Sequence, residues 1–410
     1  MRSSYCSLFP KVSMFAIIAA GAITAAAATG CTTDLDCELN GACDATSGAC
    51  ACDKGWSGAS CGALHLDPTA HVAYGYTNTS NVSSWGGGPP VYDPATGKYH
   101  LFVSEIAAHC GMSTWSRMSQ SVHTVADAVE GPYSRATTGD PLIIPTVSHN
   151  TIYAYSAPDK THLVYTIFEG RSPRSCNPYL ACSAGVTPGG AGLHPPHDWP
   201  AANCSGGPGA RGVLHYATSL DGPWTSAGPI AYSYSNPGGV PRPPNCGTSN
   251  PAPYVFPNGT VLLLGRGKDT ISNSSGSFKQ HNIFLYRAAS WNATYEWVPS
   301  DGVGGAINVG AGNDGPSTED PVLYRGRRGF HIIFHSHPDM THAWSADGLT
   351  WDWSPAVSGP PNHMAVGGGD NERPRVVLDA NGDLDWVFCG QLGVDAAHTD
   401  GARTAAFKAL

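Results

Sequence analysis

Two pairs of charged residues stand directly before a proline in this sequence. One stretch reads STEDPVLYRGRRGFHIIF, in which Glu319 and Asp320 precede Pro321, and a second pair, Glu372 and Arg373, precedes another proline. Two carboxyl groups held close together titrate differently, because the charge of one disfavours ionisation of the other. One group can then donate a proton while another accepts one, which is general acid–base catalysis. These residues are therefore the first candidates for a reaction centre.

The prolines belong to a hairpin pattern that recurs along the chain. Each opens an apolar strand, and a Gly or Asp that permits a tight turn follows eight residues later. The five copies are Pro89 with Gly97, Thr151 with Asp159, Pro251 with Gly259, Pro321 with Gly329, and Pro374 with Gly382. A third strand follows in the segments 122–133, 214–224, 285–297 and 342–353, and in shortened form in 402–410. Five units of about four short strands predict an all-β, five-bladed β-propeller over residues 88–410. A β-sandwich is the main alternative, but it would not need this fivefold recurrence.

The residues before each anchor should lie together in such a fold. The first strand of each propeller blade lines the central channel, so these residues should ring one mouth of it. The five pairs are Gly87-Gly88, His149-Asn150, Ser249-Asn250, Glu319-Asp320 and Glu372-Arg373. All but the first are polar, which suits a ligand rich in hydroxyl groups.

The repeated strands and the acids before proline resemble the propellers of glycoside hydrolase families 43 and 32. The resemblance covers residues 88–410 and implies a base on the first blade, an Asp that tunes a pKa on a later blade, and a general acid two residues before a proline. Glu319 matches the general acid. Asn250 stands where the tuning Asp is expected and Gly88 where the base is expected, so two of the three implied roles are unfilled.

The resemblance and the residues together give a set of expected roles. Glu319 is expected to be the general acid, its pKa raised by Asp320 and by partial burial. Glu372 or Glu105 is expected to supply the second carboxylate that glycoside hydrolysis needs. Substrate contacts are expected from His149, Asn150, Asn250, Arg373 and His109. Arg373 could instead hold one acid ionised, and His149 could hold a central ion.

Structural interpretations compete with several of these roles. Asp320 could begin a turn, because Asp is common there, and Glu372 could form an ion pair with Arg373 that braces the blade. Asp93 is interpreted as a turn residue. The histidines 331, 335, 337 and 342 are not expected to bind zinc. No cofactor is expected, with a structural calcium ion as the one candidate.

The composition limits the class of protein. Gly (50) and Pro (33) form a fifth of the 410 residues, which suits a chain dense in turns. The net charge of −9 without basic clusters argues against a nucleic-acid partner. Residues 1–30 contain Arg2, Lys11 and a short apolar run, which predicts a secretory signal peptide, with a signal anchor as the alternative. No other segment is long and apolar enough to span a membrane.

Cysteines and sequons also indicate export. Six Asn-x-Ser/Thr sequons occur, at Asn78, Asn81, Asn203, Asn258, Asn273 and Asn292. Twelve of the 13 cysteines lie outside the signal, and an even count in an exported chain favours disulfides. The pairing of Cys110, Cys176, Cys182, Cys204, Cys246 and Cys389 is open, with Cys110 to Cys389 as a guess.

Residues 31–61 hold the other six cysteines in 31 residues, too few to bury a stabilising core without covalent links. Their spacing, with Gly55, Trp56 and Gly58 before the last cysteine, resembles an EGF-like domain. That resemblance implies the pairs Cys31–Cys43, Cys37–Cys50 and Cys52–Cys61, whereas spacing alone allows fifteen arrangements. Residues 62–87 are predicted to be a linker or a strand that closes the last blade.

Two functions fit these patterns. The first is a secreted glycoside hydrolase that acts on an extracellular or cell-wall glycan through Glu319. The second is a non-catalytic glycan-binding or adhesion protein, with a possible protein partner at the EGF-like module, built on a propeller that lost its chemistry. The sequence favours the hydrolase, although Gly88 and Asn250 depart from the implied pattern.

Overall fold

A computed structural model describes the following parts of the chain: residues 30–77, 82–106, 111–112, 119–137, 142–144, 151–156, 162–167, 213–233, 249–273, 276–298, 306–307, 318–336, 339–354, 371–392 and 401–410. Every element of these parts is a β-strand. A search of these residues for a helix of sufficient length and apolarity to cross a membrane finds none. The predicted signal segment lies outside the described residues.

The strands of the propeller form sheets in chain order. The first sheet contains β6 (Ser83–Gly87), β7 (Val91–Asp93), β8 (Lys98–Ile106), β9 (Ser119–Ala126), β10 (Ser134–Arg135) and β11 (Leu142–Ile144). Two short sheets follow, β12 (Thr151–Ser156) with β13 (His162–Ile167), and β14 (Val213–Tyr216) with β15 (Thr225–Pro229). The next contains β16 (Tyr232–Ser233), β17 (Ser249–Val255), β18 (Val261–Asn273), β19 (Gly276–Ala288), β20 (Tyr295–Val298) and β21 (Ala306–Ile307).

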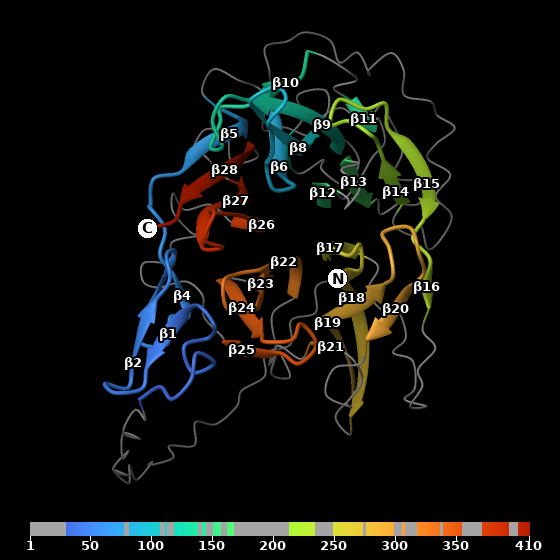
Figure 1. The fold of residues 1–410 in the computed structure, drawn as a ribbon. Coiled ribbons are helices and arrows are strands. Elements are labelled where there is room, and N and C mark those ends of the chain that lie inside the picture. The colour runs from blue at the N-terminus through green and yellow to red at the C-terminus, as the bar shows by residue number, and fades with distance from the viewer. Residues whose placement is uncertain are drawn as a thin grey trace, which may run out of the picture.

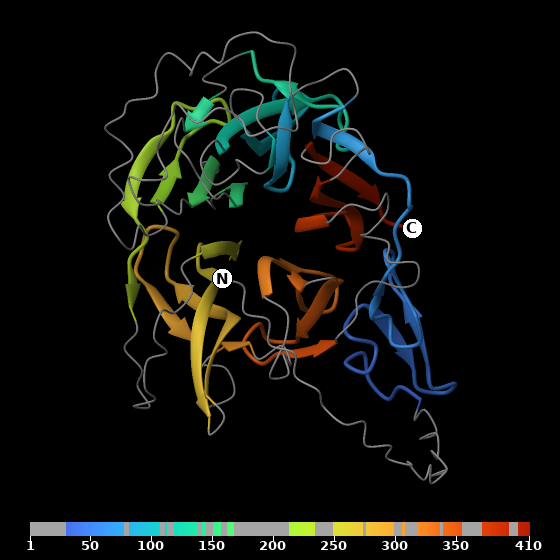
Figure 2. The same ribbon diagram turned by 180° about the vertical axis from the view of Figure 1, so that it is seen from behind.

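Two four-stranded sheets complete the series. One contains β22 (Thr318–Arg325), β23 (Phe330–Ser336), β24 (Asp339–Ser345) and β25 (Asp352–Ser354). The other contains β26 (Asn371–Leu378), β27 (Leu384–Leu392), β28 (Ala402–Lys408) and β5 (His71–Gly75). The sheets stand around a central axis, with β6, β12, β17, β22 and β26 nearest to it (Figure 1), and the view from behind shows the same ring (Figure 2).

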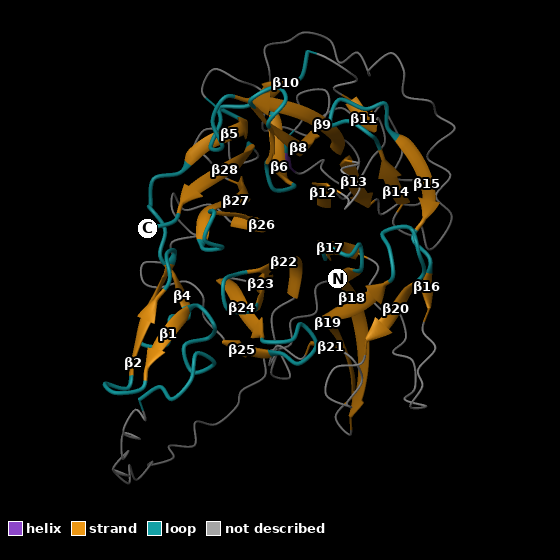
Figure 3. Cartoon of the chain, viewed as in Figure 1, coloured by secondary structure: helices purple, strands orange, loops and turns teal. Residues whose placement is uncertain are grey.

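The predicted all-β, five-bladed propeller is therefore confirmed. Blades 1 to 5 are β6–β11, β12–β15, β16–β21, β22–β25, and β26–β28 with β5. The described part of blade 2 consists of the two short sheets, and residues 168–212 lie outside the described residues. Strands and loops alternate round the whole ring (Figure 3).

The ring is closed by residues that precede the predicted propeller. β5 pairs antiparallel with β28, with Thr404 opposite Tyr74, so the segment 62–87 supplies the outermost strand of the last blade. The same segment supplies β6, the inner strand of blade 1. Ser84 Oγ lies 2.7 Å from Thr404 Oγ1, which joins the two blades at the closing point. Strands from both ends of the chain thus hold the ring together.

The inner strands carry the same irregularity near their first residues. In blades 3, 4 and 5 the pairing skips two residues, and the first of each skipped pair has a positive φ: Asn250 (47°), Asp320 (52°) and Arg373 (58°). Blade 1 skips Trp85 and Gly86, and here Gly86 has the positive φ of 67°. Non-glycine residues rarely adopt this conformation except in special turns and bulges. We call the end of the ring with these bulges the mouth, and the opposite end the far end.

The direction of the strands places the connections between them at the two ends of the ring, the far end and the mouth. Each inner strand runs from the mouth to the far end, and in blades 1, 3, 4 and 5 a short turn there leads into the second strand. Gly97, Gly259 and Gly382 have positive φ in three of these turns, as a tight connection requires. The second strands therefore return to the mouth, where the connection to the third strand ranges from two residues in blades 3 and 4 to twelve in blade 1.

Apolar side chains between neighbouring blades form the core. One cluster joins blades 2, 3 and 4 and is centred on Phe284, Tyr286 and Leu263, all almost fully buried. A second cluster joins blades 4 and 5 to the N-terminal module, and a third joins blades 1 and 5. Neighbouring blades thus cover one another's apolar faces in these contacts, which stabilises the ring by removing apolar surface from water.

The N-terminal module is tied by the three disulfides that the EGF-like resemblance implies: Cys31–Cys43, Cys37–Cys50 and Cys52–Cys61. It contains two hairpins, β1 (Gly41–Asp44) with β2 (Ala49–Cys52), and β3 (Trp56–Ser57) with β4 (Ala63–Leu64). The module packs on the far end of blades 4 and 5. Trp56 and Leu64 lie in the same buried cluster as Val322 and Phe407.

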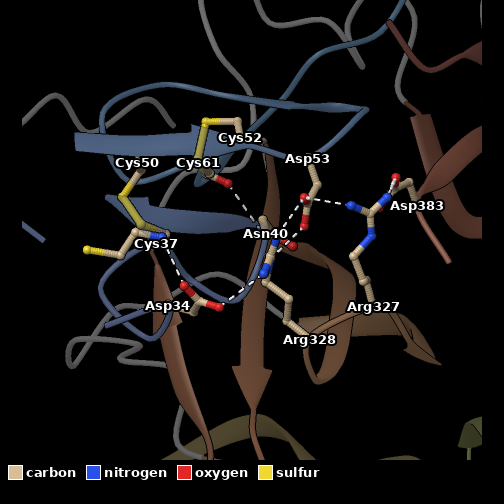
Figure 4. Close-up of polar contacts among 11 residues, drawn as sticks. Asp34, Cys37, Asn40, Cys50, Cys52, Asp53, Cys61, Arg327, Arg328 and Asp383 are labelled. Atoms are coloured by element: carbon tan, nitrogen blue, oxygen red, sulfur yellow. Dashed lines mark hydrogen bonds and ion pairs between the residues drawn. A yellow bond between two sulfur atoms is a disulfide. The ribbon is translucent and has the colours of Figure 1, made fainter. Parts of the chain in front are cut away.

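An ion-pair network covers this contact (Figure 4). Arg328, in the far-end turn of blade 4, donates from Nε to Asp53 at 3.0 Å and from Nη2 to the same carboxylate at 3.2 Å. Its Nη1 donates to Asp34 at 3.0 Å. Arg327 bonds Asp383 of blade 5 and lies 3.7 Å from Asp53. Two-point contacts of this kind fix orientation as well as adding charge attraction.

Buried histidines complete the contact between the module and blade 4. Glu38 Oε2 lies 3.2 Å from His342 Nδ1, and His342 Nε2 lies 3.1 Å from His331 Nδ1. Burial lowers the pKa of His342 to about 3. Burial, together with the neighbouring His342, also holds the pKa of His331 well below its usual value. Burial raises the pKa of Glu38. The interior of this contact therefore favours uncharged groups.

Replacement of Arg328 by Met tests the docking of the module. The substitution leaves Asp53 and Asp34 without their principal cation, so we expect a loss of about 1–3 kcal/mol in stability. Urea unfolding followed by tryptophan fluorescence measures it, because Trp56 lies in the contact. Arg325→Met is the matched control: Arg325 is exposed and packs over the Phe330 ring, so a smaller loss of under about 1 kcal/mol is expected. Equal losses in both variants would contradict the assigned contact.

Acid should destabilise the protein from near-neutral pH downward. Burial lowers the pKa of His123 and His342 to about 3 and that of His215 to about 4. Unfolded histidines take up protons below about pH 6.5 while these remain neutral in the folded state, so stability falls as the pH drops from about 6.5 towards 4. Each such histidine contributes at most about 1.4 kcal/mol per pH unit.

Glu38 acts in the opposite sense, because its raised pKa favours proton uptake by the folded state in acid. One carboxyl offsets only part of the effect of several histidines. Urea midpoints at pH 7.5, 6.5 and 5.5 measure the net result, and His342→Gln should make the dependence shallower. A midpoint that stays level or rises on acidification would show that these imidazoles are not held neutral.

Candidate functional site at the mouth of the propeller

The bulges bring the sequence-predicted residues of blades 3, 4 and 5 to one place, the mouth. For blade 1 the predicted pair, Gly87-Gly88, does not occupy the bulge. Its bulge lies at Trp85 and Gly86, and Ser84 occupies the register position of Glu319 and Glu372. The inner strand of blade 1 is interrupted after Gly87 and resumes at β7, so the proline at 89 does not mark the bulge. Gly87 is required there, because a Cβ would lie 2.2 Å from Phe102 O.

A chain of polar contacts joins four blades at this level. Asn250 Nδ2 donates to Asp320 Oδ1, and Asp320 Oδ2 lies 3.8 Å from Arg373 Nε. Arg373 Nη1 then donates to the carbonyl oxygen of Trp85 at 2.9 Å. We call these four residues the polar belt. The side chains of Asp320 and Arg373 are each 3% exposed, so the belt is a buried ion pair extended by hydrogen bonds.

The belt decides between the interpretations of Asp320 and Arg373. Asp320 sits in a strand bulge and not at the start of a turn, and its carboxylate is held by neighbours from two other blades. Arg373 pairs with Asp320, whereas Glu372 faces His335 of blade 4. Arg373 adopts φ of 58° although an arginine gains nothing from that conformation itself, so its contacts must offset a cost of about 1–2 kcal/mol.

Glu372 lies beside the belt and is accessible. Its side chain is 25% exposed, and Oε1 is 3.9 Å from Nδ1 of His335, whose own side chain is 6% exposed. His335 is also the cross-strand partner of Glu319. The mouth thus contains an acid that reaches solvent and an imidazole that is almost fully covered.

Four predicted site residues are described only in part or not at all. Glu319 belongs to β22 and occupies the register position of Glu372 on the neighbouring inner strand. Its side chain lies outside the described structure, and His109, His149 and Asn150 lie wholly outside the described residues.

Glu105 is engaged in the wall of blade 1. It accepts from Tyr74 Oη at 2.6 Å and from Gln120 Nε2 at 2.9 Å. Arg135 donates from Nε at 3.2 Å and forms an ion pair through Nη2. Burial and the adjacent Glu105 raise the pKa of Tyr74. A carboxylate with these contacts fastens blade 5 to blade 1, and its acceptor sites are largely used.

Other sequence expectations have definite outcomes. Asp93 is a turn residue, as interpreted: its side chain accepts from Ala95 N at 2.9 Å and its carbonyl accepts from Gly97 N at 2.8 Å. Cys389 is a free buried thiol, so the guessed bridge to Cys110 is absent; Cys110 itself is not among the described residues. Arg375 is fully buried and donates to the carbonyl of Pro321 at 3.3 Å, a further link between blades 4 and 5.

Among the described residues, two groups outside the mouth have potential ligand atoms within 4.8 Å of one another: the disulfide-bonded Cys31, Cys37 and Cys43, and the cluster of His100, His123 and Asp221. His100 Nδ1 lies 2.8 Å from His123 Nε2, and His123 Nδ1 lies 3.8 Å from Asp221. The imidazoles thus bond each other, and Asp221 faces the opposite nitrogen of His123. This cluster joins blades 1 and 2.

Sequence reasoning missed two residues of the mouth. Trp85 supplies a backbone acceptor to Arg373, and its ring packs where Gly390 lacks a side chain, 3.1 Å from the position a Cβ would take. His335 was noticed only as one of four clustered histidines. Its signal is the cross-strand register, because the second strand of each hairpin presents one residue opposite the acid before the bulge.

Comparisons with known proteins were made on sequence and on structure. No protein-family model and no curated protein matches the sequence. A family 117 glycoside hydrolase of the marine bacterium Zobellia galactanivorans is similar in structure, with a TM-score of 0.49 and 14% identity over 83% of this chain and 89% of the other. A thermostable family-43 glycoside hydrolase gives a TM-score of 0.47 and 11% identity over 82% and 91%.

A GH43 β-xylosidase/α-arabinofuranosidase from a compost microbial metagenome gives a TM-score of 0.45 and 10% identity over 83% of this chain and 95% of the other. At these identities no residue role is transferred from these proteins to this chain. The assignment of the propeller rests on its own sheets and register.

Replacement of Asp320 by Asn tests the polar belt. The change is isosteric but leaves the buried guanidinium of Arg373 without its carboxylate, so we expect a loss of about 3–5 kcal/mol in stability. The double variant with Arg373→Met should recover part of this loss, because no buried charge then lacks a partner. Asp127→Asn is the matched control, since Asp127 forms an exposed pair with Lys98 and should change stability by under about 1 kcal/mol. Additive losses in the double variant would show that the two charges do not interact.

Proposed function

We propose that this is an exported glycoside hydrolase that binds a glycan at the mouth of the propeller. The polar belt is the observation that carries the proposal. It fixes the relative position of four blades around one opening, so the residues beside the belt are held in place before a ligand binds, as a binding site requires. It also places a partly exposed carboxylate, Glu372, next to the buried ion pair.

The two working carboxylates are proposed to be Glu319 and Glu372. They occupy the same register position on neighbouring inner strands, each directly before a left-handed residue. Asp320 is held in the belt and Glu105 in the wall of blade 1, so the contacts of both point to roles in holding the mouth. Glu319 is assigned as general acid and Glu372 as the second carboxylate, as hydrolysis of a glycosidic bond requires.

Export is the second part of the proposal. Three disulfides form and persist in oxidising compartments, which supports an extracellular location. Two of the sequon asparagines, Asn258 and Asn292, are exposed in short turns of blade 3, where a glycosylating enzyme could reach them. We therefore propose that the predicted signal segment directs secretion and that the mature protein is a glycoprotein.

A non-catalytic glycan-binding protein is the second candidate. Blade 1 supports it, because neither Gly88, where the family resemblance implies a base, nor Ser84, Trp85 and Gly86 at the bulge supplies a carboxylate. A binding protein would need the polar belt but neither glutamate as an acid. Under this candidate the EGF-like module could also meet a protein partner through the surface that does not face blades 4 and 5.

Glu319→Gln and Glu372→Gln separate the two candidates. The chain from residue 31 would be secreted by a eukaryotic host and tested on 4-nitrophenyl furanosides, 4-nitrophenyl pyranosides and plant and algal polysaccharides. For a hydrolase, we expect each substitution to lower kcat by about 10²–10⁴-fold, because general acid–base assistance contributes that much. Binding on a glycan array should persist, since an amide keeps the shape of the side chain.

Glu130→Gln is the control, because Glu130 lies in the far-end turn after β9. Binding with no turnover of any substrate by the wild-type protein would establish the second candidate. Turnover that survives both substitutions would place the chemistry on other residues.

A further inference from the structure

His335 links the two proposed carboxylates of the mouth. It lies on β23 of blade 4 and is paired across the strands with Glu319. Its Nδ1 is 3.9 Å from Oε1 of Glu372 on blade 5. A nearly buried imidazole therefore stands between two acids of neighbouring blades, one a backbone partner and the other a side-chain neighbour.

The groups around Glu372 support a role for its contact with His335. The residue opposite Glu372 in its own sheet is Gly390, which offers no side chain. Arg373, the next residue along the strand, directs its guanidinium to Asp320 and to the carbonyl of Trp85. Arg375 points its guanidinium at the carbonyl of Pro321. Both arginines thus have contacts with other groups, and His335 is a basic group within 4 Å of the Glu372 carboxylate.

We propose that His335 is a positioning residue that orients the Glu372 carboxylate and holds it ionised. The inference rests on the proposed function, in which Glu372 is the second carboxylate. A protonated imidazole within 4 Å of a carboxylate favours its charged form. Glu319 and Glu372 occupy equivalent positions, so an environment that differs between them is what can make one an acid and the other a base.

Burial makes His335 suited to this role. A covered side chain has few rotamers available, so it can hold its neighbour in one orientation without further ordering. Its charged neighbours include Glu372, whose Oε1 lies 3.9 Å from Nδ1, and the cross-strand partner Glu319. Loss of the imidazole should therefore change the chemical step more than the binding of substrate.

The first measurement does not require activity. Carbon-13 labelling of glutamate carboxyl groups allows NMR titration of Glu372, assigned by the signal missing from Glu372→Gln. In His335→Gln we expect the midpoint of Glu372 to rise by about one pH unit, because the neighbouring positive charge is lost. By the same coupling, Glu372→Gln should lower the midpoint of the His335 imidazole. An unchanged midpoint in both titrations overturns the inference.

The second measurement uses the substrate on which the wild type is active, with a 4-nitrophenyl furanoside as the first probe. His335→Gln and His335→Ala should lower kcat by about 10–100-fold with KM changed much less, and should move the acidic limb of the kcat/KM profile to higher pH. His65→Gln is the matched control, since His65 is exposed in the N-terminal module. A pH profile that keeps its position, or equal changes in kcat and KM, contradicts the role of His335.

The two proposals can fail separately. If no substrate is turned over by the wild type, the hydrolase proposal fails, while the carbon-13 titration still decides whether His335 controls Glu372. If turnover depends on Glu372 but the titrations are uncoupled, the hydrolase stands and His335 has only a packing role. Thermal unfolding of each variant shows whether a loss of activity reflects a loss of folded protein, and the imidazole titration in Glu372→Gln leaves His335 intact.

Discussion

The buried charge of Arg373 is the constraint on which the mouth depends. A guanidinium that is 3% exposed must have a carboxylate and hydrogen-bond acceptors nearby, because an unpaired buried charge costs several kcal/mol. Asp320 and the carbonyl of Trp85 supply them, and Asn250 extends the contact to blade 3. Each partner comes from a different blade, so the blades must keep one relative position for the charge to be satisfied. The same rigidity is what a site for a hydroxyl-rich ligand requires.

The N-terminal module is bound to the propeller by the same kind of interaction. Apolar contacts of Trp56 and Leu64 form the interior of the interface, and the Arg327–Arg328 network covers its edge. Glu38 enters a pair of buried histidines in between. A module joined only by a flexible spacer would need none of these contacts. The module therefore forms one folded unit with blades 4 and 5.

Sequence patterns predicted what is local and missed what depends on contacts between blades. The hairpins follow from the spacing of Pro321 and Gly329 and its repeats, and the disulfide pairing follows from cysteine spacing through a family resemblance. The partners of Asp320 are 70 and 53 residues away, so no periodicity could reveal them. Blade 1 was misplaced because its bulge uses Trp85 and Gly86 in place of the residue before a proline. Glu105 was a candidate for the second carboxylate, and only its bonds to Tyr74 and Arg135 show that it belongs to the wall of blade 1.

The pairing of β5 with β28 has a consequence for biosynthesis. The two strands are more than 300 residues apart, so β5 is made early and stays an unpaired edge until residues 402–408 leave the ribosome. The disulfides of the module span only 9 to 13 residues and can form as soon as their cysteines emerge. Its docking partners in blades 4 and 5 are also among the last residues made. Closure of the ring and seating of the module are therefore late events, and a chain stopped short of residue 402 exposes both an open strand edge and the apolar face around Trp56.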